Sequence, residues 1–454
     1  MRSRYGKVCP TIRSRLFLLL TTFSVGFSVV SSAHAATYYV ATNGNDSNPG
    51  SEAAPWRSVA HATDKMVAGD TTYVKSGVYN ECSIHFANSG TASAPIQLLA
   101  APGNQPAIDC NDRGKLVIFL QHASGRKKEI GWITIEGLEI RNGNTGIRLY
   151  STHDLTIRRN WVHGNGQGIL GEGQRVLVDR NVVNDNGWYM NECAAGKGNF
   201  LVSASGGRIV NVCNKNHGMY PTGTNWTITN NLIYGNLTSG IQVAAYPFNP
   251  ELHATPAYAG AANWLIANNT FAYQSQGSGI VLWKDGAKNN KIINNIFYEN
   301  RQYYPGEGGQ GIVFFGDGGD HTIQNNIFYA TSNPGGTAAF GGKAGWQNKF
   351  TGSGNIINTA NPNFEGAGAT LSGVPNFKLK PGSPAIDKGQ SLSQVTWDHA
   401  GGKRPFGAAF DIGAYEFGAP PDSGSPPPNP TGGGSFPSGP ILRGPNGEVC
   451  PSGY

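Results

Sequence analysis

One short phrase recurs along the middle of the chain and constrains the fold more than any other feature. In each copy apolar residues alternate with polar ones and the phrase ends on Asn; the copies run over residues 155–160, 176–181, 226–231, 264–269, 291–295 and 321–326. The final Asn recurs at intervals of 21 to 50 residues, which suits one turn of a solenoid with loops of varying length. Because a single copy could not bury its apolar face, the copies are expected to stack.

Two more strands are expected in each repeat. A Gly followed by an apolar residue lies between successive copies, beginning at Gly146, Gly168, Gly218, Gly240, Gly279 and Gly311. A third short apolar stretch follows each Asn, as in Thr270-Phe271. The pattern predicts an all-β fold, a parallel β-helix with three short strands per coil, in which Ile147 and Leu149 face inward and Arg148 faces outward.

The final Asn residues are predicted to form one axial column. A tight bend needs a residue that tolerates left-handed backbone and bonds locally, and Asn does both. Stacked Asn side chains can also form hydrogen bonds to one another along the column. A structural role is therefore a simpler interpretation than a ligand site. The column comprises Asn160, Asn181, Asn231, Asn269, Asn295 and Asn326, and the aromatic residues expected inside the stack are Phe271, Phe297 and Phe328.

The amino terminus has the pattern of a signal peptide over residues 1–35. Five basic residues precede an apolar run over 16–30, and Ala33-His34-Ala35 follows as a cleavage site. The run is too short for a transmembrane segment, so the mature chain is expected to be secreted or at the cell surface, in an extracellular or periplasmic location. Loss of five positive charges lowers the formal charge from +6 to +1, which argues against a nucleic-acid partner.

Five cysteines remain once this leader is removed. Cys82 and Cys110 are close in sequence, as are Cys193 and Cys213, and an oxidising compartment would let both pairs form disulfides. Four cysteines allow three pairings, and proximity favours this one. Cys450 is left in the tail, either inert or available for an intermolecular bond.

Together with residues 37–46 and 69–79, the repeats resemble the pectate-lyase-like right-handed parallel β-helix superfamily over residues 36–360. The resemblance implies a right-handed coil and an amino-terminal capping helix, for which residues 55–67 are suited. The expected apolar face of that helix comprises Trp56, Val59, Ala60, Thr63 and Val67. Members of the superfamily include lyases, hydrolases, epimerases and non-catalytic adhesins, so the resemblance specifies the fold and not the activity.

The remaining residues divide into two parts. Residues 361–418 resemble a segment of bacterial surface β-helix proteins, which implies a carboxy-terminal cap over the strand edges of the last coil. Residues 419–454 are rich in Pro and Gly and too poor in apolar residues to fold, so they are expected to be a disordered tail. We expect a monomer, with attachment to the cell surface through this tail left open.

In enzymes of this resemblance the substrate lies along the outer face of the strand that begins Gly-Ile. The residues implied for polysaccharide binding are Tyr150, Glu172, Gln242, Tyr246, Trp283, Lys284, Asp285 and Phe315. The interval between Asn181 and Asn231 is about twice a normal coil, and long insertions of this kind are usually functional. It runs directly onto the outer strand through Lys215, His217 and Tyr220.

These residues suggest a polysaccharide lyase that cleaves a uronate-containing polymer by β-elimination. The reaction needs a cation for the carboxylate, a base for the adjacent proton and an acid for the leaving oxygen. Arg148 suits the first role, because a guanidinium meets a carboxylate bidentately and stays charged. Lys215 or His217 is the candidate base and Tyr220 the proton donor or relay, with a purely structural role for His217 as the alternative.

Two other functions stay open. A glycoside hydrolase of the same fold needs paired carboxylates about 5–9 Å apart, a condition that Asp285 and Asp317 meet loosely. A non-catalytic surface protein would use the same face for carbohydrate binding or adhesion. The sequence identifies no cofactor with certainty. Calcium stays open at Asp317 with Asp320, or at Asp46, although two carboxylates fall short of the ligands calcium needs and a turn explains them more simply.

Overall fold

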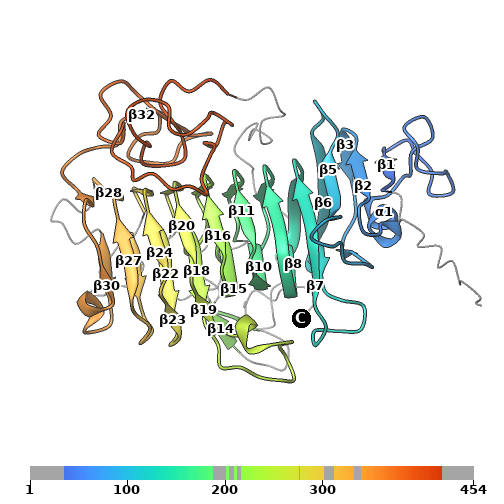
Figure 1. Ribbon diagram of the computed structural model, residues 1–454, viewed down its shortest axis with the longest axis horizontal. Coiled ribbons are helices and arrows are strands. Elements are labelled where there is room, and N and C mark those ends of the chain that lie inside the picture. The colour runs from blue at the N-terminus through green and yellow to red at the C-terminus, as the bar shows by residue number, and fades with distance from the viewer. Residues whose placement is uncertain are drawn as a thin grey trace, which may run out of the picture. The chain divides into compact units, whose positions relative to one another are not determined.

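The chain is built almost wholly of β-strands. The computed structural model describes residues 35–187, 201–203, 209–211, 216–275, 277–300, 311–331 and 339–421. Within these residues, 29 strands belong to one sheet, in which strands of successive coils pair in parallel (Figure 1). The predicted parallel stack of three-stranded coils is confirmed.

The strands form three faces that run along the stack. The first face comprises β1 (Thr37–Val40), β2 (Thr71–Val74), β5 (Ile96–Ala100), β7 (Ile130–Glu136), the end of β8 (Glu139–Arg158), β11 (Leu177–Asp179), β16 (Thr227–Thr229), β20 (Leu265–Ala267), β24 (Lys291–Ile293), β27 (His321–Gln324) and β30 (Phe350–Thr351). The second face comprises β4 (Ile84–His85), the end of β6 (Pro106–Leu120), the middle of β8, β10 (Gln167–Gln174), β15 (Met219–Thr224), β18 (Ile241–Ala244), β22 (Ile280–Trp283), β26 (Ile312–Phe314) and β29 (Phe340–Gly342).

The third face and the shorter elements complete the described chain. The third face comprises β3 (Gly77–Tyr79), the starts of β6 and β8, β9 (Trp161–His163), β12 (Val182–Asn184), β17 (Leu232–Tyr234), β21 (Thr270–Ala272), β25 (Ile296–Tyr298), β28 (Ile327–Tyr329) and β31 (Ile356–Ile357). The other elements are β19 (Ala261–Ala262), β23 (Ala287–Lys288), the hairpin β13 (Leu201–Ser203) and β14 (Ile209–Asn211), the pair β32 (Phe364–Gly366) and β33 (Asn376–Leu379), and the helices α1 (Val59–Lys65), η2 (Pro256–Tyr258) and η3 (Trp346–Asn348).

Alternation along the second face gives the core its columns. Ile147 and Leu149 are fully buried, and Arg148 between them faces outward, as predicted. On the third face, the rings of Phe271 and Phe297 are parallel with centroids 5.0 Å apart, and Phe328 continues the stack at 4.7 Å. All three rings are buried, so the expectation that they face the interior is confirmed.

The predicted Asn column is also confirmed. Each side-chain amide donates to the side-chain oxygen of the Asn one coil further on, as from Asn231 to Asn269 at 2.9 Å and from Asn269 to Asn295 at 3.0 Å. The column runs from Asn160 through Asn326 and continues to Asn355. The left-handed backbone, however, belongs to the residue before each of them, such as Asn230 with φ 56° or Arg180 with φ 56°.

A second ladder lies one strand further along each coil. The amide of Asn165 donates to Asn186, Asn186 donates to Asn236, and Asn236 donates to Gln274, at 3.0 to 3.2 Å. The backbone N–H of Gln274 then donates to the side chain of Asn300 at 3.2 Å. Each coil is therefore fastened to the next at two corners by buried amides that satisfy backbone groups as well as each other.

A short helix lies inside the segment expected to form the cap. Helix α1 begins after Ser58, whose side chain accepts from the N–H of His61, and ends at Lys65. Val59 is buried, but Val67 is 46% exposed, so its expected place on the buried face is wrong because the helix ends before it. That the helix plugs the end of the stack stays a prediction.

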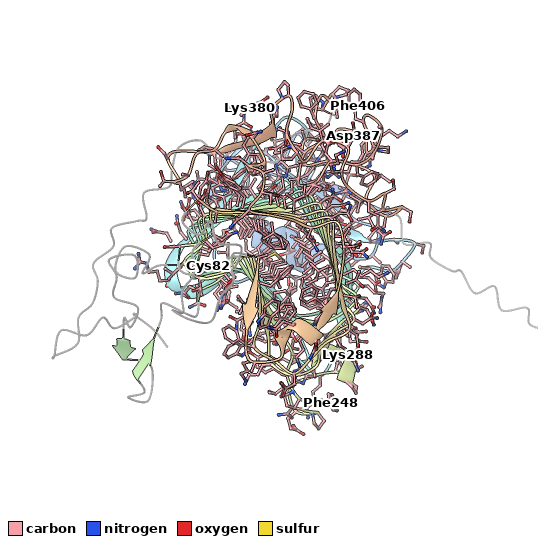
Figure 2. The ribbon with its side chains drawn as sticks, turned by 90° about the vertical axis from the view of Figure 1, so that its left-hand side faces the viewer. Cys82, Phe248, Lys288, Lys380, Asp387 and Phe406 are labelled. Atoms are coloured by element: carbon pink, nitrogen blue, oxygen red, sulfur yellow. A yellow bond between two sulfur atoms is a disulfide. The ribbon has the colours of Figure 1, made fainter. Side chains whose placement is uncertain are left out.

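Residues 361–418 lie against the third face and its Asn turns. Phe377 packs on the rings of Tyr234 and Tyr273, with centroids 5.5 and 6.1 Å away. Figure 2 shows Lys380, Asp387 and Phe406 on one side of the coil stack. The contacts run along the side of the stack, because the outer positions of the third face are apolar and the segment buries them. That the segment also covers the strand edges of the last coil stays a prediction.

The left-handed Asn residues of the turns fasten this segment. Asn268 donates to the backbone oxygen of Asp411 at 2.9 Å, and Asn294 donates to that of Gln390 at 2.8 Å. Arg404 donates to the side chain of Asn230 at 3.2 Å and pairs with Glu416 in a fully buried ion pair. In a consecutive pair such as Asn268-Asn269, the second Asn thus belongs to the column inside the stack, and the first bonds to residues 361–418 on its side.

One expected disulfide lies in the described chain. Cys82 and Cys110 are bonded, with an S–S distance of 2.01 Å, as predicted. Cys193, Cys213, Cys450, the leader over 1–34 and the tail from 422 lie outside the described residues. In the described part, no helix is long and apolar enough to cross a membrane.

Candidate functional site

Five side chains form a row on the outside of the second face, one from each coil. In order along the stack they are Phe119, Arg148, Leu170, Tyr220 and Gln242, which follow one another in register and are half-buried. Neighbouring strands lie about 4.8 Å apart, so this outer row is about 19 Å long. It runs along the face on which the sequence predicts the substrate.

A charged cluster surrounds Tyr150 beside this outer row. The guanidinium carbon of Arg126 lies 3.9 Å from the centroid of the Tyr150 ring and that of Arg148 lies 4.4 Å from it. Arg148 also donates to the Tyr150 hydroxyl at 2.8 Å. Arg126 forms an ion pair with Glu172, which is 5% exposed and accepts from the backbone N–H of Ser151 at 3.4 Å. The cluster therefore holds two cations and one carboxylate.

Within the described residues the positive charge of Arg148 has no partner of opposite charge. No carboxylate of the described residues lies within 4.0 Å of its guanidinium, whereas Arg126, Arg158 and Arg175 each have one. The Nε of Arg148 is buried and has no hydrogen-bond partner in the described chain. The Nε of Arg126 is in the same state, so it is the unpaired charge of Arg148, and not its covered Nε, that suits this residue to an anion from outside.

A long connection after β18 forms one side of the site. Residues 245–260 return over the coils of β8 and β10, where the N–H of Ala254 donates to the hydroxyl of Ser151 at 3.3 Å. Tyr258 donates to Glu129 at 2.6 Å, and Lys127 pairs with Glu251 at 2.6 Å. This connection and the one over 121–129 are thereby joined above Glu172, and Nε2 of His253 lies 3.8 Å from its carboxylate.

His217 lies two residues before β15 and Tyr220 lies on it, but only Tyr220 is accessible. The ring centroids are 5.3 Å apart. His217 is 1% exposed, its Nδ1 accepts from the N–H of Ser239 at 3.4 Å, and burial lowers its pKa to about 3. Tyr220 is hydrogen-bonded to the hydroxyl of Tyr246, and burial first, then this bond, raises the pKa of Tyr220. Lys215 lies outside the described residues.

These facts separate the two candidate roles at β15. A neutral imidazole whose Nδ1 already accepts a backbone N–H has its proton on Nε2 and is a poor base. A phenol with a raised pKa keeps its proton at neutral pH, as a proton donor must. The geometry favours the structural role for His217 and keeps Tyr220 as a candidate acid.

The other expected binding residues lie further along the stack. Trp283 and Phe315 are half-buried and meet edge to face, with centroids 5.3 Å apart. Lys284 and Asp285 are exposed, and the Asp285 carboxylate accepts from the backbone N–H of Asp317 at 2.7 Å. The Asp317 side chain is 84% exposed and 3.9 Å from the Lys349 amino group. The paired-carboxylate alternative at Asp285 and Asp317 stays a prediction.

Asp46, one of the residues considered for calcium, has structural partners. Asp46 accepts from the backbone N–H groups of Arg57 and Ser58 at 2.8 and 2.9 Å and from the Ser58 hydroxyl at 2.8 Å. These bonds hold the turn before α1. The described chain has no group of three or more His, Cys, Asp or Glu side chains arranged to hold a metal ion.

The sequence interpretation missed two residues of the charged cluster. Arg126 belongs to the basic run Arg126-Lys127-Lys128 in a connection between strands, and His253 belongs to the connection after β18. The basic run was a detectable signal, because a loop with three consecutive cations beside a polysaccharide face suggests an anion partner. Nothing in the sequence indicates that His253 lies close to Glu172, since 81 residues separate them.

Comparison with known proteins agrees with the fold. Residues 38–200 match the family described as Pel9A-like, right-handed β-helix region, and residues 193–335 match a family of unknown function, DUF1565. The chain is 42% identical over 76 residues to pectate lyase PEL9 of Emericella nidulans, and 27% identical over 148 residues to the uncharacterized protein YwoF of Bacillus subtilis. These alignments cover 16% and 29% of this chain and only 18% and 31% of the two relatives.

Among solved structures, pectate lyase Pel9A is similar with a TM-score of 0.43 and 16% identity, covering 84% of this chain and 96% of that one. The family model thus matches residues 38–200 as a Pel9A-like right-handed β-helix region, and the described chain has the parallel β-helix fold that its repeats predict.

Proposed function

We propose that this protein is an exported polysaccharide lyase that cleaves a uronate-containing polymer along the outer row. The observation that carries the proposal is Arg148, a half-buried cation without a carboxylate among the described residues. A uronate carboxylate supplies the missing charge and accepts N–H bonds from a guanidinium.

The reaction assigns three roles. Arg148 neutralises the carboxylate, which makes the hydrogen on the adjacent carbon more acidic. A base removes that proton, the electron pair forms a carbon–carbon double bond, and the bond to the glycosidic oxygen breaks. An acid returns a proton to the leaving oxygen, so the step is balanced without an oxidant, a reductant or water.

Lys215 is the proposed base and Tyr220 the proposed acid. Lys215 precedes β15 on the chain and would act with its pKa lowered by a neighbouring cation. Tyr220 has the half-buried, protonated hydroxyl that the acid needs, and it lies two coils from Arg148, about 10 Å along the outer row. The carboxylate, the abstracted proton and the leaving oxygen belong to one uronate, so the two long side chains are proposed to converge on the same sugar from these two positions.

Export and attachment form part of the proposal. Residues 1–35 would be removed as a signal peptide, residues 361–418 would protect the third face, and residues 419–454 would serve as a linker or attachment segment. Amino-terminal sequencing of exported protein should begin at Ala36. A mature chain that begins at Met1 contradicts the export.

An activity screen tests the lyase. The mature protein is incubated with pectate, alginate and rhamnogalacturonan, and the ultraviolet absorbance of unsaturated ends is followed. Lys215→Ala and Tyr220→Phe should each lower turnover by roughly 10²- to 10⁴-fold while melting temperatures stay unchanged. Reducing ends without unsaturated ends indicate a hydrolase, and polymer binding without cleavage indicates a carbohydrate-binding surface protein; either result contradicts the lyase.

A further inference from the structure

Three large apolar side chains are exposed close together on the connection after β18. Tyr246 is 40% exposed, Phe248 43% and Leu252 41%. Only nine large apolar side chains of the described chain are exposed to this degree, and three of them lie within seven residues. Exposed apolar groups gathered at one place usually mark a binding surface, because each would otherwise gain free energy by burial.

The connection that carries these rings is held at both ends and in the middle. The N–H of Tyr246 donates to the backbone oxygen of Ala259 at 2.7 Å, which closes the connection at its base. Asn249 and His253 bond to each other through backbone and side chain at 2.9 and 3.1 Å. With the bonds to Ser151, Lys127 and Glu129, these contacts fix the rings before any ligand arrives, so little conformational entropy is lost on binding.

Both aromatic rings adjoin the site described above. The Tyr246 hydroxyl is bonded to that of Tyr220, which belongs to the outer row. The Phe248 ring has its centroid 6.1 Å from that of His253, which approaches Glu172 in the charged cluster. Figure 2 shows Phe248 at the edge of the molecule, outside the ring of strands. Tyr246 thus lies beside the outer row and Phe248 beside His253, and the two rings are called the platform below.

The chemistry of this platform differs from that of Arg148. Over residues 245–253 the only acidic side chain is Glu251, which is paired with Lys127, and there is no Lys or Arg. An aromatic face packs on the C–H face of a pyranose, and a phenol hydroxyl can bond to a sugar hydroxyl. Neither contact depends on a carboxylate of the sugar.

We propose that Tyr246 and Phe248 form a second sugar subsite, which stacks a pyranose of the same polymer beside the uronate held by Arg148. The inference rests on the proposed function, which supplies the polymer. It adds that the subsite recognises the ring and not the charge of the sugar. Removal of Phe248 should therefore weaken binding of acidic and methyl-esterified polymers alike, whereas removal of Arg148 should weaken only the acidic one.

The test measures binding separately from cleavage. Retardation of the protein is measured in native gels that contain pectate or highly methyl-esterified pectin, for the wild type, Phe248→Ala, Phe248→Trp and Leu252→Ala. Leu252→Ala is the matched control, because this side chain is equally exposed on the same connection but has no aromatic face.

The expected result is a two- to tenfold loss of affinity in Phe248→Ala, by about the same factor on both polymers, with recovery in Phe248→Trp and no change in Leu252→Ala. If Phe248→Ala and wild type are retarded equally on both polymers, the subsite is overturned. It is also overturned if neither polymer retards the wild-type protein. Equal losses in Phe248→Ala and Leu252→Ala also overturn it and indicate a protein contact. Retardation without unsaturated ends overturns the lyase and leaves the subsite standing.

Discussion

The guanidinium of Arg148 lies over the ring of Tyr150, 4.4 Å from its centroid, and donates a hydrogen bond of 2.8 Å to the hydroxyl of the same residue. One neutral aromatic side chain thus orients a cation without neutralising it. This arrangement leaves the charge available to a ligand and gives it a fixed direction. An ion pair with a carboxylate would also have fixed the direction of the guanidinium, but it would have neutralised its charge.

Two replacements of Tyr150 should therefore weaken the binding of acidic polymers to different degrees. Tyr150→Phe removes the hydroxyl and keeps the ring, and we expect a loss of affinity below about threefold. Tyr150→Ala also removes the ring contact to both Arg126 and Arg148, and the loss should reach about tenfold. Titration calorimetry with acidic oligosaccharides measures both changes, and equal losses in the two variants would show that the ring does not orient Arg148.

His217 should contribute to the pH dependence of stability rather than to turnover. Its pKa is lowered to about 3 in the folded protein by burial, against about 6.5 when unfolded. Below about pH 6.5 the imidazole is therefore protonated in the unfolded chain but stays neutral in the folded one. The free energy of unfolding falls accordingly as the pH is lowered. His217→Asn keeps an acceptor for the N–H of Ser239 and removes the titrating group.

From pH 7 to pH 5, the wild type should lose about 2 kcal/mol of unfolding free energy relative to His217→Asn. Denaturant unfolding at the two pH values measures this difference. Turnover of His217→Asn should stay within about threefold of wild type, because the residue touches no substrate. A loss of 10²-fold or more with unchanged folding would instead make His217 the base.

The Asn column should be among the most sensitive parts of the stack. Asn269 accepts from the backbone and side chain of Asn231 and donates to Asn295 and to two backbone oxygens. Asn269→Ala leaves these buried groups unbonded, which should cost about 3 kcal/mol or more. Asn376→Ala, an exposed Asn on β33, is the control and should cost less than about 1 kcal/mol. Equal losses in thermal melts would show that the column does not hold the coils together.

The segment over 361–418 should depend on Arg404. Its guanidinium is fully buried, pairs with Glu416 and donates to the backbone oxygens of Asp411 and Gly413. Arg404→Met leaves the Glu416 carboxylate buried and unpaired, a cost of about 3–5 kcal/mol. Limited proteolysis should then cut within 361–418 faster, whereas Lys403→Ala, the exposed neighbour, should behave like wild type. If Arg404→Met resists the protease as well as wild type does, the stability of the segment does not depend on the ion pair of Arg404 with Glu416.

The interior of the fold could be predicted from the sequence because it repeats. A column such as Asn231 and Asn269 needs the same residue at the same place in every coil, and that regularity is visible without coordinates. The ladder from Asn165 through Gln274 to Asn300 was missed although each member follows a column Asn by five residues, since one member is Gln and no Asn pair marks these positions. The left-handed turn was assigned one residue too late, since both Asn residues of each pair suit it equally.

The site could be predicted only where a residue belongs to a repeat. Arg148 and Tyr220 lie on strands, so the alternation places them on the outer row. Arg126 and His253 come from connections that the repeat does not govern, and long-range contacts such as that of His253 with Glu172 leave no periodic signal. The position of 361–418 along the side of the stack was missed for the same reason, because the apolar outer positions of the third face were not recognised as a surface to be covered.

The most direct test of the account is the effect of Arg148 on cleavage of an acidic polymer. Initial rates of unsaturated-end formation are compared for wild type, Arg148→Lys and Arg148→Ala over a range of polyuronate concentrations. If Arg148 neutralises the substrate carboxylate, Arg148→Ala lowers kcat/KM by about 10²-fold or more, and Arg148→Lys recovers part of it because the charge remains without the bidentate geometry. Rates of Arg148→Ala within about threefold of wild type, in protein that melts at the same temperature, would contradict the account.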